Sequence, residues 1–408
     1  MPTVPRRLAG TIIGYSGLND FIPFYAVYAL LFADAGLSIG KISSLFAIWS
    51  LTALVVEVPS GAWADVVPRR LLLALGPGLH ALGFASWILA PNYAGFALGF
   101  ILWGAGSSLI SGTLEALVYD ELAAVGATRT YAALMGYAGS ASTVGILAAT
   151  FLAAPLFAVG GYPLVGWSSV AVPAAQGLLA LTLPQAPVVA AADETEGGSA
   201  PSSRSFAGRY LGMLRAGLGE VTGARLVRNA VLLTAVVYGL NTHDEYFALV
   251  AQEKGATVAV AALLVGITSV GEVIGTALAG RTVGMGNSTM AGLLVLAAVL
   301  FAGGSALGGL LGFVGLAVAS GIHNNLIVVN EARLQDTVEG PARATVTSVT
   351  GLLTEVVALA TFAGYAAGSP WLPVSVLVAL FALPLLAVAA VVPRWSPPSD
   401  PDAPRPQG

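Results

Sequence analysis

The sequence predicts an all-α membrane protein whose chain crosses the bilayer twelve times. Hydrophobic residues make up 56% of its 408 residues and charged residues only 9%, far less charge than a soluble protein of this length needs to cover its surface. Apolar runs of about 20 residues, the length of a membrane-crossing helix, recur along the chain. These runs are continuous and do not alternate with polar residues, which excludes a transmembrane β-barrel.

We expect membrane helices over twelve runs, which are residues 8–33, 42–66, 71–90, 93–119, 131–154, 162–183, 229–251, 258–280, 288–306, 310–329, 346–367 and 371–392. The first run follows Arg6 and Arg7 as a signal peptide would, but it is too long for one and many similar runs follow. Glycine and proline occur inside several runs. Membrane helices tolerate both residues, and small residues let neighbouring helices approach closely.

A polar segment over residues 184–228 divides the predicted helices into two groups of six. It begins with acidic residues, glycine and serine and continues with five arginines, which predicts a flexible linker followed by an amphipathic stretch on the membrane surface. The predicted organisation is an N-terminal six-helix bundle over 1–183, a cytoplasmic linker over 184–228, a C-terminal six-helix bundle over 229–393 and a disordered cytoplasmic tail over 394–408.

The two halves repeat short patterns in the same order. The first run carries Tyr15-Ser-Gly-Leu-Asn19, and the seventh carries Tyr238-Gly-Leu-Asn241. Arg129 likewise precedes the fifth run and Arg343 the eleventh. Matches in the same order indicate a duplicated six-helix unit, so we expect two pseudo-symmetric bundles.

Basic residues predict that both termini lie in the cytoplasm. With the N-terminus inside, only Lys41 and Lys254 of the 17 Lys and Arg residues fall outside, as the excess of positive charge on cytoplasmic loops requires. We therefore expect a multi-pass protein of the cytoplasmic membrane, surrounded by the lipid bilayer and monomeric.

Several functional classes are excluded by what the sequence lacks. It has no cysteine, and its three histidines are far apart and form no recognisable metal motif. A net charge of −4 without a basic patch argues against nucleic acid as a partner. The Gly-x-x-x-x-Gly-Lys-Ser/Thr loop that would indicate direct ATP coupling is also absent. We expect no cofactor, no metal and no enzymatic activity, because a membrane-bound enzyme or sensor would need a catalytic constellation or a soluble domain.

The residues between the second and third runs resemble a family signature. They read Gly61-Ala-Trp-Ala-Asp65-Val-Val-Pro-Arg69-Arg70, which is similar to the pattern Gly-x-x-x-Asp-x-x-Gly-Arg-Arg/Lys of the major facilitator superfamily, with Pro68 where the pattern has glycine. The preceding Glu57-Val-Pro-Ser-Gly61 resembles the Glu-x-Pro-Thr-Gly run of many bacterial members. Together with the twelve runs and the central loop, the resemblance covers the whole chain. It implies the major facilitator fold and a secondary transporter that works by alternating access, with two six-helix halves rocking around a midplane site.

The resemblance also implies a conformational clasp at the cytoplasmic ends of helices 2, 4 and 11. The residues that match it are Gly61, Asp65, Arg69 and Arg70 of the signature, with Asp120 and Arg129 as expected partners. The alternative is that these charges only set the topology.

Four acids lie near the middle of the predicted membrane helices, where ionisable groups are costly and therefore candidates for function, while Glu115, Asp244 and Glu245 lie nearer the ends of their runs. The four are Asp20, Glu57, Glu272 and Glu355. No Lys or Arg occupies a helix interior, so we interpret these carboxylates as proton-coupling candidates and expect a cationic or neutral substrate, since an anion normally needs a basic partner. The alternative is a purely structural role.

In the family that the chain resembles, helices 1, 4, 7 and 10 line the central cavity. The resemblance therefore selects polar and aromatic side chains on these helices as substrate-cavity candidates, which are Asn19, Tyr25, Trp103, Tyr238, Asn241, His243, Asp244, His323 and Asn324. Aromatic rings beside carboxylates suit organic cations. The alternative for Asn and His is a simple hydrogen bond between helices.

Two specific functions follow. The favoured one is proton-coupled efflux of cationic or neutral amphipathic small molecules, including drugs, and the alternative is proton-coupled uptake of a neutral metabolite or sugar. Motifs do not establish export: Phe100 stands where many drug exporters have arginine before Gly104 and Gly106, and residues 139–145 lack the Gly-Pro motif of drug/proton antiporters. A polar, hydroxyl-binding cavity would favour uptake, and an apolar aromatic cavity with carboxylates would favour efflux.

Overall fold

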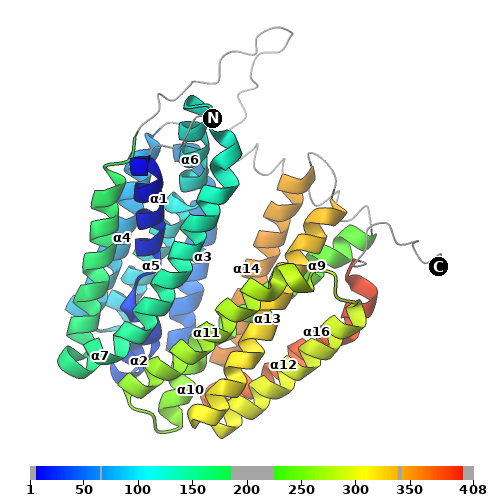
Figure 1. Ribbon diagram of the computed structural model, residues 1–408. Coiled ribbons are helices and arrows are strands. Elements are labelled where there is room, and N and C mark those ends of the chain that lie inside the picture. The colour runs from blue at the N-terminus through cyan, green and yellow to red at the C-terminus, as the bar shows by residue number, and fades with distance from the viewer. Residues whose placement is uncertain (1–5, 65–66, 185–224, 339–341, 398–408) are drawn as a thin grey trace. The chain divides into compact units, whose positions relative to one another are not determined.

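The computed structural model describes residues 6–64, 67–184, 225–338 and 342–397, and this part of the chain is helical, without a β-strand. The chain forms two compact units (Figure 1). Unit 1 comprises residues 1–25 and 48–210, and unit 2 comprises residues 26–47 and 211–408. Most of the predicted linker and of the predicted tail lies outside the described residues, so the predicted boundaries of these segments stay a prediction.

Unit 1 is built from the first six predicted runs, apart from the segment 26–47. Its elements are α1 (Arg6–Asn19), most of η1 (Pro23–Ala26), the larger part of α3 (Ile39–Ala64), α4 (Arg69–Leu89), α5 (Tyr93–Ile110), α6 (Thr113–Ala124), η2 (Thr128–Thr130) and α7 (Tyr131–Ala180). The long α7 is two helices joined at a kink, where Gly161 has φ +61°. A residue with a side chain adopts this conformation at a cost, so the glycine permits the turn between predicted runs five and six.

Unit 2 contains the last six predicted runs together with the segment 26–47. Its elements are α2 (Tyr28–Asp34), the first turns of α3, α9 (Arg225–Gly239), η3 (Leu240–Tyr246), α10 (Phe247–Glu253), α11 (Val258–Thr282), α12 (Asn287–Leu307), α13 (Gly309–Thr337), α14 (Ala342–Gly368), α15 (Val374–Leu380) and α16 (Ala382–Trp395).

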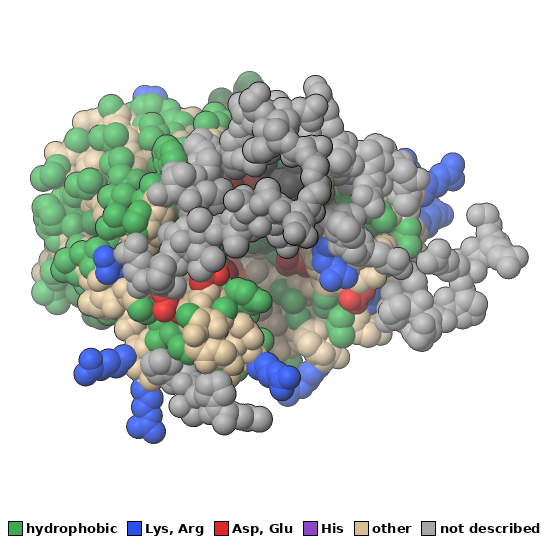
Figure 2. Space-filling view, turned by 90° about the horizontal axis from the view of Figure 1, so that it is seen from above, with side chains coloured by type: hydrophobic (Ala, Val, Ile, Leu, Met, Phe, Trp, Pro, Cys, Tyr) green, Lys and Arg blue, Asp and Glu red, His purple; other side chains and the backbone are tan. Residues whose placement is uncertain are grey.

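The predicted all-α membrane class is confirmed. Nine helices in the described part of the chain are long and apolar enough to cross a membrane. Each of the twelve predicted runs is helical over most of its described length, but the helix is interrupted in the first, fourth, seventh and twelfth runs, and the fifth and sixth runs lie on either side of the kink in α7. Hydrophobic side chains gather on the left part of the face seen in Figure 2, and Lys and Arg side chains project at its margin.

Glycines bring helix backbones into contact in both units. In unit 1, a Cβ atom on Gly83 of α4 would lie 2.8 Å from the carbonyl oxygen of Gly99 in α5. In unit 2, a Cβ atom on Gly304 of α12 would lie 2.6 Å from the carbonyl oxygen of Gly312 in α13. Membrane helices associate through such small residues because lipid provides no hydrophobic driving force between them.

Candidate functional site

The first and seventh predicted runs are both interrupted helices. In unit 1, α1 ends at Asn19, residues 20–22 are not helical, and the chain continues as a 3₁₀ turn from Pro23. In unit 2, α9 ends at Gly239 and a 3₁₀ segment, η3, runs to Tyr246 before α10 begins. Helices broken at corresponding positions of two repeats typically form the substrate and ion sites of secondary transporters. Five of the predicted candidates lie at these two breaks, namely Asn19, Asp20, Asn241, His243 and Asp244.

A chain of hydrogen-bonded side chains surrounds the break in unit 1. Asn19 Nδ2 donates to Asp20 Oδ1 at 3.2 Å, and Ser142 Oγ of α7 donates to the other carboxylate oxygen, Oδ2. Gln176, also in α7, donates through Nε2 to Asn19 Oδ1 at 3.0 Å and to the Tyr15 carbonyl oxygen at 3.3 Å. Asp20 is therefore held by neutral donors. It is only half-buried, so it stays accessible to a ligand or a proton.

Sequence reasoning identified Asn19 and Asp20 but missed Ser142 and Gln176. Gln176 is the one amide in the sixth predicted run, and this could have indicated its role. It is fully buried, and its Oε1 atom has no hydrogen-bond partner within the described residues. An orphaned acceptor at such depth is costly, so this oxygen is a ready partner for a donor on a ligand or a water molecule.

Aromatic rings form the second feature of unit 1. Tyr25 stacks on Trp103 of α5, with ring centroids 5.2 Å apart and planes 15° from parallel, and Trp49 packs on Trp103 at 5.2 Å. On the α5 side, Phe100 also stacks on Trp103, at 5.7 Å. The plane of Trp103 is therefore fixed by its neighbours, while Tyr25 is half-buried. Both predicted candidates, Tyr25 and Trp103, lie together.

Three carboxylates gather at the break in unit 2. Asp244 and Glu245 belong to η3, and Glu272 of α11 lies close enough for its charge to interact with both of them. The Tyr28 hydroxyl donates to Glu245 Oε2. None of the three carboxylates has an Arg or Lys partner within the residues that the structure describes. Sequence reasoning selected Asp244 and Glu272 for separate roles; the structure brings them together and adds Glu245, which adjoins Asp244 in the sequence.

Two stacked tyrosines accompany these acids. Tyr246 of η3 stacks on Tyr365 of α14, with ring centroids 3.7 Å apart and planes 10° from parallel. The Tyr246 hydroxyl shares a hydrogen bond of 2.7 Å with Ser43 Oγ. The Tyr365 hydroxyl is buried and has no hydrogen-bond partner in the described part of the chain, and the Asp244 carboxylate is near enough to interact with it. Tyr365 was missed because the sequence gives no indication that α14 approaches η3.

The histidine candidates lie in a closed aromatic environment. His243 and His323 are fully buried, with ring centroids 5.6 Å apart. His243 Nδ1 donates to the Leu240 carbonyl oxygen at 2.9 Å, and His323 Nε2 donates to the Val237 carbonyl oxygen at 2.8 Å. The other nitrogen of each ring has no partner among the described residues. Beside them, Asn324 Nδ2 donates to Asn241 Oδ1 at 3.3 Å, which links α13 to the break in the seventh run.

The remaining acid candidates do not join these groups. Glu57 is exposed on α3, and Glu355 is half-buried on α14, where its charge acts on Tyr238 of α9. Of the four predicted proton-coupling residues, Asp20 and Glu57 belong to unit 1, and Glu272 and Glu355 belong to unit 2. Their roles stay predictions.

One contact of the predicted clasp is present. Arg69 at the start of α4 forms an ion pair with Asp120 of α6. Arg129 is exposed in η2, and Arg70 has a buried Nε atom without a hydrogen-bond partner in the described residues. Gly61 lies in α3, and Asp65, the acid of the signature, lies outside the described residues.

Arg333 near the C-terminal end of α13 is a structural residue that sequence reasoning counted only as a topology-setting charge. It is 3% exposed. Its guanidinium donates to the Val283 carbonyl oxygen at 2.9 Å, to Asn287 Oδ1 at 2.8 Å and to Ser396 Oγ at 3.2 Å. These neutral acceptors come from the ends of α11, α12 and α16, so Arg333 ties four helix ends together.

Comparisons with known proteins identify the fold. No family model matches the sequence, and no curated protein matches it. Solved transporter structures do match the chain over nearly its whole length. A variant of the nucleoside transporter NupG aligns with a TM-score of 0.76 at 13% identity, covering 94% of this chain and 98% of that one. The peptide transporter PepTSo of the POT family gives 0.69 at 11% identity, covering 96% and 97%. A D-xylose–proton symporter gives 0.64 at 15% identity, covering 96% and 98%. The predicted major facilitator fold is confirmed.

Proposed function

We propose that this chain, which has the major facilitator fold, is a secondary transporter that takes up a neutral, polar metabolite together with protons. The observation that carries the proposal is the network of neutral donors around Asp20 at the break in the first membrane run. The named substrates of the structural neighbours, a nucleoside, a peptide and D-xylose with a proton, support uptake over the drug efflux that the sequence favoured.

The chemistry of this break suits a substrate with hydroxyl groups. Asn19 and Gln176 supply amide groups, Ser142 supplies a hydroxyl, and Gln176 Oε1 has spare capacity to accept a hydrogen bond. The half-buried Tyr25 ring on Trp103 offers a flat surface for a sugar face or a nucleobase. Neither feature includes an Arg or Lys, which argues for a neutral substrate over a phosphate or a carboxylate.

In this proposal Asp20 carries the coupling proton. The deprotonated carboxylate accepts hydrogen bonds from Asn19 and Ser142. Protonation from the outside gives Asp20 a donor for a substrate hydroxyl, and release of that proton to the cytoplasm leaves the carboxylate free for the next cycle. One proton then enters with each neutral substrate molecule, so the transport rate depends on both the pH gradient and the membrane voltage.

Uptake of labelled nucleosides and pentoses by cells that express the chain tests the proposal. We expect concentrative uptake by the wild type and a loss of at least about tenfold in Asp20→Asn, because a carboxamide, unlike a carboxylate, cannot take up and release a proton near neutral pH. Exchange of labelled for unlabelled substrate should persist in that variant. Asp336→Asn, which changes an exposed acid at the inner end of α13, is the matched control. Lower accumulation in wild-type cells than in cells without the chain would overturn uptake.

Efflux of organic cations is the second candidate, and the acids in unit 2 favour it. Asp244, Glu245 and Glu272 have no basic partner in the described part of the chain, and the stacked rings of Tyr246 and Tyr365 lie beside them. Carboxylates and aromatic faces together attract cations. Resistance to cationic drugs that is present in wild-type cells and absent in Glu272→Gln cells would favour this candidate.

A further inference from the structure

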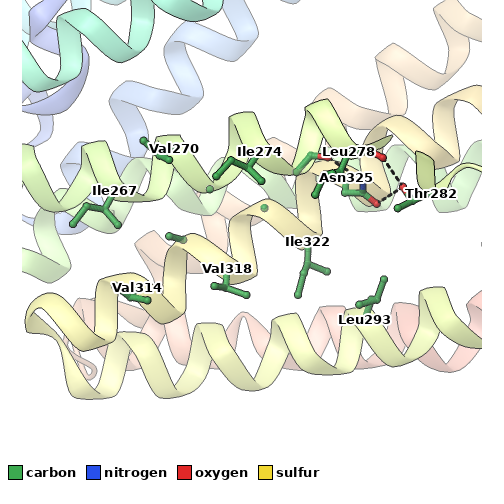
Figure 3. Close-up of a pocket in the computed structure, with 14 residues that line it drawn as sticks. Ile267, Val270, Ile274, Leu278, Thr282, Leu293, Val314, Val318, Ile322 and Asn325 are labelled. Carbon is green, nitrogen blue, oxygen red and sulfur yellow. Dashed lines mark hydrogen bonds between the residues drawn. The ribbon is translucent and has the colours of Figure 1, made fainter. Parts of the chain in front are cut away.

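We propose that unit 2 binds an anionic phospholipid, with one acyl chain in an apolar groove between α11 and α12 and the headgroup phosphate at Arg281. Figure 3 shows this groove, in which α13 forms the floor and α11 and α12 form the two walls. Its volume is about 440 Å³, within the range of about 300–1,000 Å³ that is typical of ligand sites.

The groove exists because α11 packs against α13 at backbone distance. A Cβ atom on Gly321 of α13 would lie 2.6 Å from the carbonyl oxygen of Gly271 in α11, and one on Gly275 would lie 2.7 Å from the Gly321 Cα atom. All three glycines also line the groove. Because these glycines have no side chains, they leave space between α11 and α13 for the groove, and Leu293 of α12 forms the side of the groove opposite α11 (Figure 3).

The lining suits a hydrocarbon chain. Apart from Thr282 and Asn325 it consists of glycine, alanine and aliphatic side chains. Ile274 is 54% exposed and Val318 is 49% exposed, so the groove opens on a surface that faces lipid in a membrane protein of this fold. Along α11 it extends from Ile267 to Thr282, which at about 1.5 Å per residue is roughly 22 Å. That length exceeds the roughly 15 Å of one hydrocarbon leaflet.

The two polar side chains of the groove are already occupied. Thr282 Oγ1 donates to Asn325 Oδ1 at 3.0 Å, and Asn325 Nδ2 donates to the Gly275 carbonyl oxygen at 2.9 Å, as the dashed lines in Figure 3 indicate. A polar solute would therefore lose its hydration in the groove without gaining partners. This argues for an apolar occupant along the wall of α11.

Arg281 supplies the charge that selects the headgroup. Ile274, Leu278 and Arg281 follow one another at intervals of four and three residues, which puts them on one face of α11. Arg281 therefore continues the groove-lining stripe at its polar end. It is exposed, and no described carboxylate pairs with it. An unpaired guanidinium next to a hydrocarbon slot matches a phosphate joined to an acyl chain, and under the predicted orientation this lipid belongs to the inner leaflet.

Native mass spectrometry of the purified full chain in detergent, titrated with phosphatidylglycerol or phosphatidylcholine, tests the proposal. We expect tighter binding of phosphatidylglycerol. Arg281→Gln should weaken phosphatidylglycerol binding about fivefold and leave phosphatidylcholine binding unchanged, as expected for one basic residue at the membrane surface. Val318→Trp should fill the groove and weaken the binding of both lipids.

Two variants serve as controls. Arg394→Gln removes another exposed arginine near a helix end, and Val356→Trp adds the same bulk at an exposed position of α14; neither should change lipid binding. Size-exclusion elution reports whether each variant is folded. Equal binding of the two lipids, or phosphatidylglycerol binding that survives Arg281→Gln, would overturn the proposal. Unchanged binding in a folded Val318→Trp variant would overturn it as well.

Discussion

The contact between α11 and α13 gives the sharpest quantitative prediction, and Gly321→Ala tests it. The added Cβ atom would lie 2.6 Å from the Gly271 carbonyl oxygen, whereas Cβ atoms in proteins essentially never come closer than 3.0 Å to such a neighbour. The clashing atom belongs to a backbone, so relief requires α11 to move away from α13 by at least about 0.4 Å. Overpacking of this kind costs about 1–3 kcal/mol.

Gly315→Ala is the matched control on the same helix. A Cβ atom there would meet its nearest neighbours at 3.8 Å, an ordinary contact. Both substitutions gain the same helix propensity of about 0.8–1.0 kcal/mol, so this gain cancels when the two variants are compared. The stability difference between them should then equal the cost of the clash, about 1–3 kcal/mol.

Thermal denaturation of the two purified variants in the same detergent measures this difference. At about 2–4 °C for each kcal/mol in a unit of this size, Gly321→Ala should melt roughly 2–12 °C below Gly315→Ala. Equal Tm values would refute the reasoning, because they would mean that α11 and α13 are not in backbone contact in the folded protein.

Three further outcomes follow from contacts in the structure. Arg333→Gln should lower Tm, because removing its charged hydrogen bonds should reduce the free energy of unfolding by about 1.5–3 kcal/mol. An unchanged Tm would show that the packing of the four helix ends does not depend on this side chain. Asp120→Asn should change the free energy of unfolding by less than about 1 kcal/mol, because its ion pair with Arg69 is largely exposed. The same substitution should lower the initial rate of uptake, because it removes a contact of the predicted clasp. An unchanged rate would show that Asp120 has a topological role only. Tyr28→Phe should cost about 0.5–1.5 kcal/mol by removing the hydrogen bond to Glu245, and its Tm in parallel with wild type checks this contact.

The helices could be predicted from the sequence because lipid imposes a simple rule: each crossing needs a continuous apolar run, and a helix satisfies its own backbone. Every predicted run is helical over most of its described length. The breaks at Asp20 and at residues 240–246 were not predicted as breaks, although each carries polar residues that the sequence analysis selected. A polar residue in an apolar run indicates a special position, but it does not say whether the helix continues through it.

The partners of the site residues were beyond sequence reasoning. Ser142 and Gln176 reach the first break from α7, more than 120 residues further along the chain, and nothing in their local sequence reveals this contact. Tyr365 and Arg333 were missed for the same reason, since burial of a helix-end arginine or a stack between α14 and η3 depends on tertiary packing. The clasp was predicted from a resemblance, and of its members the structure pairs Arg69 with Asp120.

The direction of proton movement relative to substrate is the most direct test of the proposed mechanism. Proteoliposomes that contain the purified chain and a trapped pH-sensitive dye, held at equal pH on both sides, report it when a nucleoside or a pentose is added outside. Coupled uptake predicts that the lumen becomes more acidic with the wild type and stays unchanged with Asp20→Asn. A lumen that becomes more alkaline when a transported compound enters would contradict the account, because it would mean that proton and substrate move in opposite directions.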